Sequence, residues 1–566
     1  MKAAQPGKYS VPAYIRALKP KNVSCLVKKI DGGYYVYEHK RVDDPKNPGK
    51  KKNATGAYLG VIDEVNLRFI PSGDFSNEKR SSICYTLPSL LDYGKYALPI
   101  AVSGDVLTRL KKVFENSNDC ETIYVISLIY FANHYVPARD IKELYTQSYL
   151  SWKYPNVSLS ENSVSDFLSS LGNHIKERLK FEQSLIDEGS GKYNIDGHVV
   201  LCCSVNNELS DYGSKYQKLG DKQENFMMVY DAGNKRVISC AAFDGSLPDK
   251  SAVLDTLKQH KFIKSRFRVD SGFYCEILLG EFRKNDCIFI VPVPGTTILK
   301  KMAFKRLIFK ASFIHQRMDS HRNIVFSSVQ YIEYTVDELE AFAIQEALEE
   351  YQEKLAKQEK EQKNGEKLPK IYPKKINRSQ FPKDRVIVYK DSLMHDKLVF
   401  DYRCNIGDGK HTEEELATLE PQFGVILLRT NDSNATAEQL YIEYKDRWPI
   451  ETFYNYVRNG VDFNAFHESD YNVQQGISFI MVVEGLIYAS VQKKIDNADF
   501  AYVKNMSMDE CIRKSGRQKL AQLQDGTWVT NEIKSKSQKM FDYFGVDAAK
   551  DIEDLNRMAA MKKAKS

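Results

Sequence analysis

Residues 193–200 read YNIDGHVV, a pattern typical of a β-strand but with an aspartate in its middle. Aromatic and β-branched side chains are typical of a strand that is at least half buried. A carboxylate within such a strand is unfavourable unless a cation or a polar partner compensates it. Asp196 is therefore the first candidate functional residue.

Outward from this strand, the pattern alternates between strands and helices. Candidate strands cover 193–204, 225–230 and 237–243, followed by a helix at 249–260, a strand at 266–269, a helix at 273–284 and a strand at 287–293. The order βββαβαβ, a meander followed by parallel crossovers, is that of an RNase H-like core. We predict an α/β fold built on such a core.

A second candidate carboxylate, Asp270, follows the strand at 266–269, and α/β sheets hold ligands at the carboxyl ends of their strands. In the predicted order, the strands of Asp196 and Asp270 are neighbours. Their carboxylates could share metal ions about 3.5 to 4 Å apart, as in phosphodiester chemistry. Hard oxygen ligands favour Mg²⁺ or Mn²⁺ over zinc. The alternative for either aspartate alone is a turn or capping residue.

The third candidate lies in a segment that begins at Tyr444 and reads YKDRWPIETFYNYVR. On a helix, the spacing places Tyr444, Arg447, Glu451 and Arg458 on one face. That face would combine a carboxylate for a metal with two arginines for DNA phosphates. Pro449 either kinks this helix or marks the first turn of a new one. An amphipathic helix held by internal salt bridges is the alternative.

These motifs resemble the Asp-Asp-Glu transposases of bacterial insertion sequences, over about 193 to 460. The quoted features are Asp196-Gly197, Asp270-x-Gly272-Phe273, the run at 424–431 and the segment that starts at Tyr444. They look most like the insertion-sequence-4 superfamily, whose signature is Tyr-x2-Arg-x3-Glu-x6-Lys. Arg458 stands where that signature has lysine and keeps the positive charge.

The resemblance implies that Asp196, Asp270 and Glu451 form the catalytic, metal-binding triad, with two Mg²⁺ or Mn²⁺ ions. It also implies contacts to DNA from a second set of residues: Tyr444, Arg447, Trp448 and Arg458. For Trp448, stacking on a flipped base and simple packing are both open.

As a transposase, the chain would bind double-stranded DNA at terminal inverted repeats, cut the transposon ends and join them to target DNA, as a homodimer in the synaptic complex. Two alternatives are an RNase H-like nuclease or resolvase without transposition, and a DNA-binding derivative without catalysis. Both would share parts of the same pattern.

The domain organisation follows from changes in periodicity. We predict a small β-rich module at 1–95, a helical DNA-binding region at 96–188, the first part of the catalytic core at 189–295, an inserted mixed α/β domain at 296–436, the second part of the core with the Glu451 helix at 437–500, and a helical region at 501–566. Inside the insertion, Thr335 and Glu338 form a capping box, and strands are expected at 385–389, 397–402 and 423–428.

The composition limits the class of protein. A net charge of +6, from 81 Lys and Arg against 75 Asp and Glu, excludes a simple polycation. The 10 cysteines include no CxxC pair, so neither zinc fingers nor a disulfide scaffold is expected. The most apolar stretch, 477–491, is short and contains Glu484, which favours a buried helix over a membrane span. We expect a cytoplasmic, nucleoid-associated protein that does not bind membranes.

Overall fold

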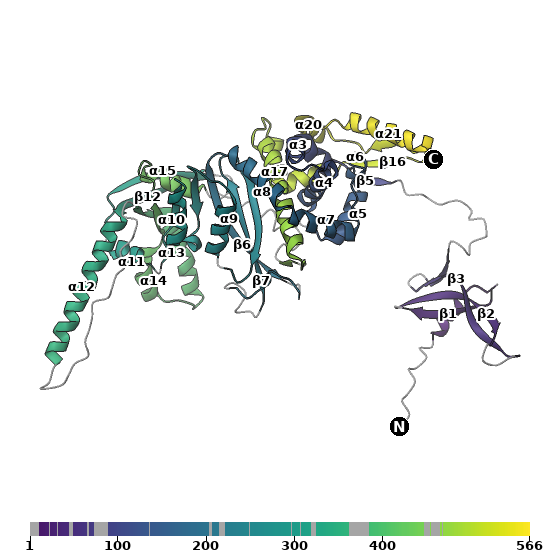
Figure 1. Ribbon diagram of the computed structural model, residues 1–566, viewed down its shortest axis with the longest axis horizontal. Coiled ribbons are helices and arrows are strands. Elements are labelled where there is room, and N and C mark those ends of the chain that lie inside the picture. Colours follow the sequence, from purple (N-terminus) through teal and green to yellow (C-terminus); the bar gives the residue numbers. More distant parts are fainter. Residues whose placement is uncertain are drawn as a thin grey trace, which may run out of the picture. The chain divides into compact units, whose positions relative to one another are not determined.

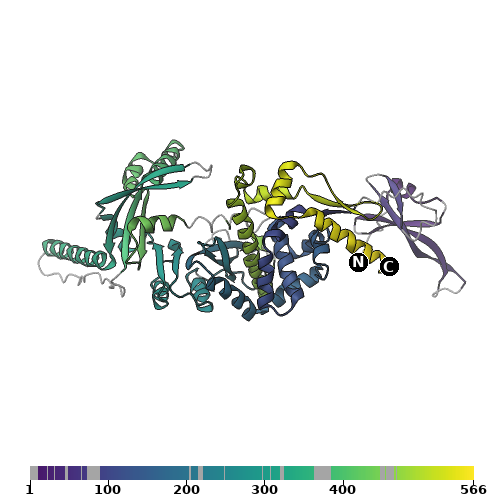
Figure 2. The same ribbon diagram turned by 90° about the horizontal axis from the view of Figure 1, so that it is seen from above.

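The computed structural model (Figures 1 and 2) describes residues 11–21, 23–30, 32–44, 49–64, 67–72, 89–134, 136–202, 206–213, 221–247, 249–295, 297–305, 307–318, 324–361, 384–446, 453, 465–466 and 468–565. The chain divides into two compact units, Met1–Leu87 and Pro88–Ser566.

In its described residues, the first unit is a small antiparallel sheet with one helix. Its elements are α1 (Ala13–Ala17), β1 (Cys25–Ile30), β2 (Gly33–Asp43), β3 (Lys51–Asp63) and β4 (Arg68–Pro71), in the sheet order β1-β2-β3-β4. Alternation along the strands buries one face, where Tyr34, Val36 and Leu59 pack against Ile15 of α1.

The second unit begins with β5 (Leu90–Asp92) and a series of helices. These are α2 (Gly94–Val102), α3 (Gly104–Val113), α4 (Ser117–Asn133), α5 (Ala138–Thr146), α6 (Leu150–Lys153), α7 (Glu161–Asn173) and α8 (Ile175–Asp187). Helix α4 is buried from Thr122 to Ala132 and packs against α17 (Tyr471–Asp496). A helix that is apolar on all sides belongs in a core.

Helix α17 contains the most apolar stretch of the sequence. Among the described residues it is the one helix that is long and apolar enough to cross a membrane, and 83% of its most apolar window is buried within the protein. The prediction of a buried core helix at 477–491 is therefore confirmed.

The central sheet of the second unit has ten strands among the described residues, in the order β11-β12-β13-β14-β10-β9-β6-β7-β8, with β15 beside β6. Its first part runs β6 (Lys192–Cys202), β7 (Gln223–Asp231), β8 (Arg236–Asp244), α9 (Asp249–Gln259), β9 (Arg266–Val269), the 3₁₀ turn η2 (Ser271–Phe273), α10 (Glu276–Lys284) and β10 (Ile288–Pro292). Strands β6, β7 and β8 are antiparallel, whereas β9 is parallel to both β6 and β10.

The segment predicted as an insertion does not form a sheet of its own. Its strands β11 (Ala311–Met318), β12 (Ile324–Thr335), β13 (Arg385–Asp391) and β14 (Val425–Thr430) continue the central sheet through the antiparallel pair β14–β10. Its helices are α11 (Ile298–Lys305), α12 (Val336–Glu361), α13 (Ser392–Gly407) and α14 (Glu413–Leu419), followed by the turn η3 (Glu420–Gln422). The capping box is present, since the amide of Glu338 donates to the Thr335 hydroxyl over 3.1 Å.

The strand predicted at 397–402 is wrong, because these residues lie inside α13. Strands β13 and β14 pair directly with each other, which leaves no place between them for another strand. The helix is started by Asp391, whose carboxylate accepts the amides of Leu393 and Met394.

The remaining elements are α15 (Ala437–Lys445), β15 (Ala465–Phe466), α17, α18 (Ala501–Lys504), α19 (Met508–Ser515), β16 (Lys519–Gln522), β17 (Trp528–Thr530), α20 (Ser535–Phe544) and α21 (Ala548–Lys565). The region from 501 on is not purely helical, because β16 and β17 form a small sheet with β5. Residues 90–92 thus belong to the second unit, whereas the N-terminal module was predicted to extend to residue 95.

Candidate active site

Asp196 and Asp270 occupy matching positions on neighbouring parallel strands. The register pairs Ile195 of β6 with Val269 of β9, and each aspartate is the next residue along its strand direction. Residues in register on adjacent strands, about 4.8 Å apart, point to the same face of a sheet. Ile195 and Val269 are buried in the main core, so the aspartates point to the opposite face.

Local backbone contacts orient both carboxylates. The amide of Gly197 donates to Oδ1 of Asp196 over 3.0 Å, and the amide of Ser271 donates to Oδ1 of Asp270 over 2.7 Å. Asp270 also caps the turn η2. Both aspartates are half-buried. Two oriented carboxylates on one face supply the hard oxygen atoms that Mg²⁺ or Mn²⁺ prefers.

The third predicted ligand, Glu451, lies outside the described residues, as do Arg447, Trp448 and Arg458. Within the described ranges no group of three or more His, Cys, Asp and Glu side chains is placed to hold a metal ion. Among the described residues, the candidate ligands are therefore the carboxylates of Asp196 and Asp270, whose oxygen atoms suit a hard divalent cation.

Helix α15, which leads toward Glu451, is fixed to the strand that leads to Asp270. Arg266 of β9 donates from Nε and Nη2 to the two carboxylate oxygens of Glu443, over 3.0 and 2.7 Å, and from Nη1 to Asp432 over 2.6 Å. The hydrogen bond with Glu443 raises the pKa of Arg266. A guanidinium held in this fork has little freedom, so α15 and β9 have one relative position.

A second arginine of β9 makes the same connection. Arg268 donates from Nη1 to the backbone oxygen of Glu443 over 2.9 Å and is 3% exposed. Burial lowers the pKa of Arg268, although the Glu443 carboxylate acts in the opposite direction. Arg268 pairs in register with Asn194, two residues before each aspartate, and therefore lies on the aspartate face of the sheet.

Tyr444 is the one residue of the predicted DNA-contact set that the structure describes. It follows Glu443 on α15 and packs, partly buried, against a core cluster that includes Tyr389, Leu440 and Tyr441. Part of its role is thus packing of α15 against the sheet, which the helical spacing alone did not indicate.

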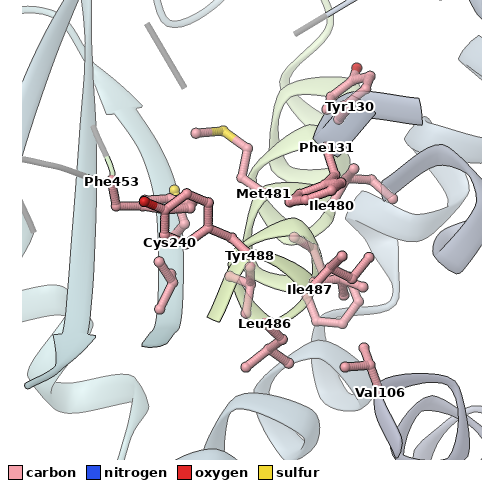
Figure 3. Packing of buried hydrophobic residues seen from close by; sticks show 14 of the residues in the cluster. Val106, Tyr130, Phe131, Cys240, Phe453, Ile480, Met481, Leu486, Ile487 and Tyr488 are labelled. Atoms are coloured by element: carbon pink, nitrogen blue, oxygen red, sulfur yellow. The ribbon is translucent and has the colours of Figure 1, made fainter. Parts of the chain in front are cut away.

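Phe453, two residues beyond Glu451, lies on the aspartate face as well. The register pairs Asp196 with Met228, and Met228 with Cys240, so these three side chains share a face. Figure 3 shows Cys240 close to Phe453 and Tyr488. The rings of Phe453 and Tyr488 meet edge to face with their centroids 5.4 Å apart.

Helix α17 approaches this face very closely at Gly485. A Cβ atom there would meet Cβ of Val237 at 2.8 Å and the ring of Phe453 at 3.3 Å. A side chain larger than hydrogen at this position would therefore push α17 away from β8 and from Phe453. The described chain on both sides of Glu451, α15 and Phe453, is thus fixed to the sheet.

Two buried acids near this face, Glu484 and Glu224, were not among the functional residues predicted from the sequence. Glu484 precedes Gly485, is 1% exposed, and burial raises its pKa to about 8. Burial also raises the pKa of Glu224 to about 7, while Oε1 of Glu224 accepts from Asn207 and, over 3.2 Å, from Gln474. For Glu484, the signal in the sequence was a charged residue within an apolar stretch.

Comparison with known proteins identifies the family. The family model described as transposase DDE domain matches residues 194–482, about half of the chain and both aspartates. The chain belongs to this family of DDE transposases. No curated protein matches it.

One solved structure found by the comparison is the cryo-EM structure of the piggyBac transposase synaptic complex with hairpin DNA. It is 9% identical in sequence with a TM-score of 0.33, and the match covers 76% of this chain and 81% of the piggyBac chain.

Proposed function

We propose that this chain is a transposase that binds terminal inverted repeats, cleaves the DNA at transposon ends and transfers the 3′ ends to target DNA by a cut-and-paste route. The observation that carries the proposal is the matching register of Asp196 and Asp270 within the family domain. We further assign the chain to the insertion-sequence-4 superfamily, on the segment that begins at Tyr444.

The catalytic core is, in this proposal, RNase H-like. The strand order β8-β7-β6-β9-β10, with β6, β7 and β8 antiparallel and β9 and β10 parallel to β6, supports this interpretation. Residues 189–295 and 437–500 would make the core, and 296–436 the insertion that widens its sheet. The two aspartates then lie on its central neighbouring strands.

Asp196, Asp270 and Glu451 would hold two Mg²⁺ or Mn²⁺ ions. When bound, such ions supply an activated nucleophile and stabilise the charge on the leaving oxygen. The protein residues contribute orientation: the amides of Gly197 and Ser271 hold the carboxylates of the two aspartates. Positioning of this kind, together with electrostatics, accounts for most catalysis in phosphoryl transfer.

Support for Glu451 as the third ligand comes from its described neighbours. Arg266 and Arg268 fix α15 to the strand of Asp270, and Phe453 packs on the aspartate face. Glu451 is only two residues from Phe453 in the sequence, and we therefore propose it as the third ligand.

DNA contacts at the transposon ends are assigned to Tyr444, Arg447, Trp448 and Arg458. Arginine forms two parallel hydrogen bonds to phosphate, which suits strand ends that must be held for in-line attack. We also propose a homodimer in the synaptic complex and a cytoplasmic, nucleoid-associated location.

The test is a cleavage and joining assay on the DNA that flanks the gene, where the proposal expects inverted repeats. The full chain should produce Mg²⁺-dependent nicks at the repeat ends and joined products with target plasmid. Glu451→Gln should remove both products, while Glu438→Gln, an exposed glutamate in the first turn of α15, should keep both. Cleavage without joining would instead identify a nuclease or resolvase, and binding without cleavage would identify an inactive derivative.

A further inference from the structure

Positive charge is concentrated in the first compact unit. Residues Met1–Leu87 contain 16 Lys and Arg against 8 Asp and Glu, a net +8, whereas the whole chain carries +6. The rest of the chain is therefore slightly negative. The helical region at 96–188, where the sequence suggested DNA binding, has 9 Lys and Arg against 12 Asp and Glu. A phosphate backbone is attracted to the first unit more than to these helices.

Part of this charge lies on a two-stranded ribbon. Strand β1 pairs with β2 only as far as Glu38, and β4 pairs with β3 only over Gly60–Asp63. The pairs from His39↔Thr55 to Asp43↔Lys51 continue beyond both of these outer strands. Figure 2 shows this hairpin running out from the small sheet.

The ribbon and its end carry five exposed basic side chains: Lys40, Arg41, Lys50, Lys51 and Lys52. Acidic groups nearby are fewer. Glu38 forms an ion pair with Lys40 at 3.0 Å, and Asp43 and Asp44 lie near the turn. Because Arg41 and Lys52 alternate to opposite faces of the ribbon, positive charge is available on both faces.

At the base of the ribbon, the face of the sheet opposite its core carries tyrosines. The ring of Tyr58 lies 6.3 Å from that of Tyr35 and 5.5 Å from that of Tyr37, and Nζ of Lys28 lies 5.5 Å from the ring of Tyr37. Tyr58 is 42% exposed. Phenol hydroxyls and ammonium groups both donate hydrogen bonds to phosphate oxygens.

We propose that the β2–β3 ribbon binds duplex DNA by inserting into the major groove, with the tyrosine face contacting the adjacent phosphates. Two strands about 4.8 Å apart, with side chains on both faces, fit a groove about 12 Å wide that admits a two-stranded β-ribbon. Basic side chains on both faces then reach the phosphates of both groove walls. The inference rests on the proposed function, since it names the surface with which a transposase of this kind holds DNA.

The test uses the full chain and a short fluorescein-labelled duplex of arbitrary sequence, in EDTA so that no cleavage occurs. The triple variant Arg41→Gln, Lys51→Gln and Lys52→Gln should flatten the dependence of log K on log salt by about 0.9 for each lost phosphate contact, hence by up to about 2.7. Its circular dichroism should match the wild type, because all three side chains are exposed.

Two control proteins accompany the triple variant. A charge-matched control replaces three exposed lysines elsewhere, Lys354, Lys357 and Lys410, with glutamine and should keep the wild-type slope. The exchange of Lys51 and Lys52 for arginine should also keep it, because charge and not lysine itself is required. An unchanged slope in the triple variant overturns the proposal, and so does a change seen with single-stranded DNA but not with the duplex.

Failure of this inference is distinguishable from failure of the proposed function. Glu451→Gln should bind the duplex with the wild-type slope, since it lies outside the ribbon. If the triple variant shows a flatter salt dependence but the wild type never cleaves or joins repeat ends in Mg²⁺, the ribbon binds DNA and the proposed transposase reaction is wrong. If the wild type cleaves the repeat ends and the triple variant keeps the wild-type salt dependence, the transposase reaction is supported and DNA binding by the ribbon is wrong.

Discussion

Arg266 and Glu443 join the strand that leads to Asp270 to the helix that leads to Glu451. Their two hydrogen bonds, 3.0 and 2.7 Å long, connect residues 177 positions apart in the chain. Arg266 also pairs with Asp432, whose side chain is 3% exposed. One guanidinium thus fixes α15 relative to the strand that precedes Asp270.

Replacing Arg266 with alanine should destabilise the protein and impair cleavage beyond the loss of folded protein. Removing one partner of a largely buried ion pair leaves the other charges unpaired, which costs about 3 to 5 kcal/mol when burial is complete and about 2 kcal/mol or more here. Urea unfolding gives the stability and a single-turnover assay gives the cleavage rate. Arg557→Ala, which removes an exposed pair with Asp554, should change the stability by less than about 1 kcal/mol. Equal small effects of both variants would contradict the role of Arg266.

Asp270→Asn should abolish Mg²⁺-dependent strand cleavage and leave binding to end DNA largely intact. The amide keeps the shape of the side chain but removes the negative charge that a divalent cation requires. Gel assays of nicking and anisotropy of labelled end DNA measure the two properties separately. Asp401→Asn, on the exposed side of α13, is the matched control and should cleave normally. Cleavage retained by Asp270→Asn would remove Asp270 from the metal site.

Arg447→Ala and Arg458→Ala should each flatten the salt dependence of binding to end DNA by about 0.9, if each arginine neutralises one phosphate. An arginine held only in salt bridges within its own helix would instead lower the thermal stability with no change of slope. Tyr444→Phe should weaken binding by about 0.5 to 1.5 kcal/mol, the contribution of one hydrogen bond, because the ring still packs against the sheet. Titrations at several salt concentrations and melting curves decide between these outcomes.

Titration of Glu484 should lower the free energy of unfolding as the pH rises. The pKa of Glu484 in the folded protein is about 8, above the ordinary value of 4.5 that applies to the unfolded chain. The folded state therefore keeps the proton up to a higher pH than the unfolded state does. Between these two pH values the unfolded state releases the proton first, and the free energy of unfolding decreases by about 1.4 kcal/mol per pH unit. Above about pH 8 the loss is complete.

Glu484→Gln removes this titration and should be more stable than the wild type by a few kcal/mol above about pH 8, with the difference shrinking toward about pH 4.5. Urea unfolding at a series of pH values measures it. The exposed Glu353 of α12 provides the control, since Glu353→Gln should follow the wild-type curve. Parallel curves for Glu484→Gln and the wild type would show that Glu484 is not buried as a neutral acid.

Much of the fold followed from local patterns. The strand pattern around Asp196, the apolar stretch at 477–491 and the capping box of Thr335 and Glu338 depend on neighbours in the chain, and the structure contains the strand, the buried helix and the cap. The strand expected at 397–402 is not present, because these residues form part of α13. A strand there would have to pair with a sheet edge, and β13 already pairs with β14. Propensity alone does not contain that information.

For the candidate site, the local pattern was enough to predict that Asp196 and Asp270 stand at strand positions. The parallel pairing and register of their strands, the attachment of α15 by Arg266 and Arg268, and the continuation of the sheet from β11 to β14 became evident from the three-dimensional structure. Side-chain periodicity depends on residues a few positions apart, and it can therefore be recognised in the sequence. Register and helix docking are instead set by hydrogen bonds and ion pairs between residues far apart in the chain.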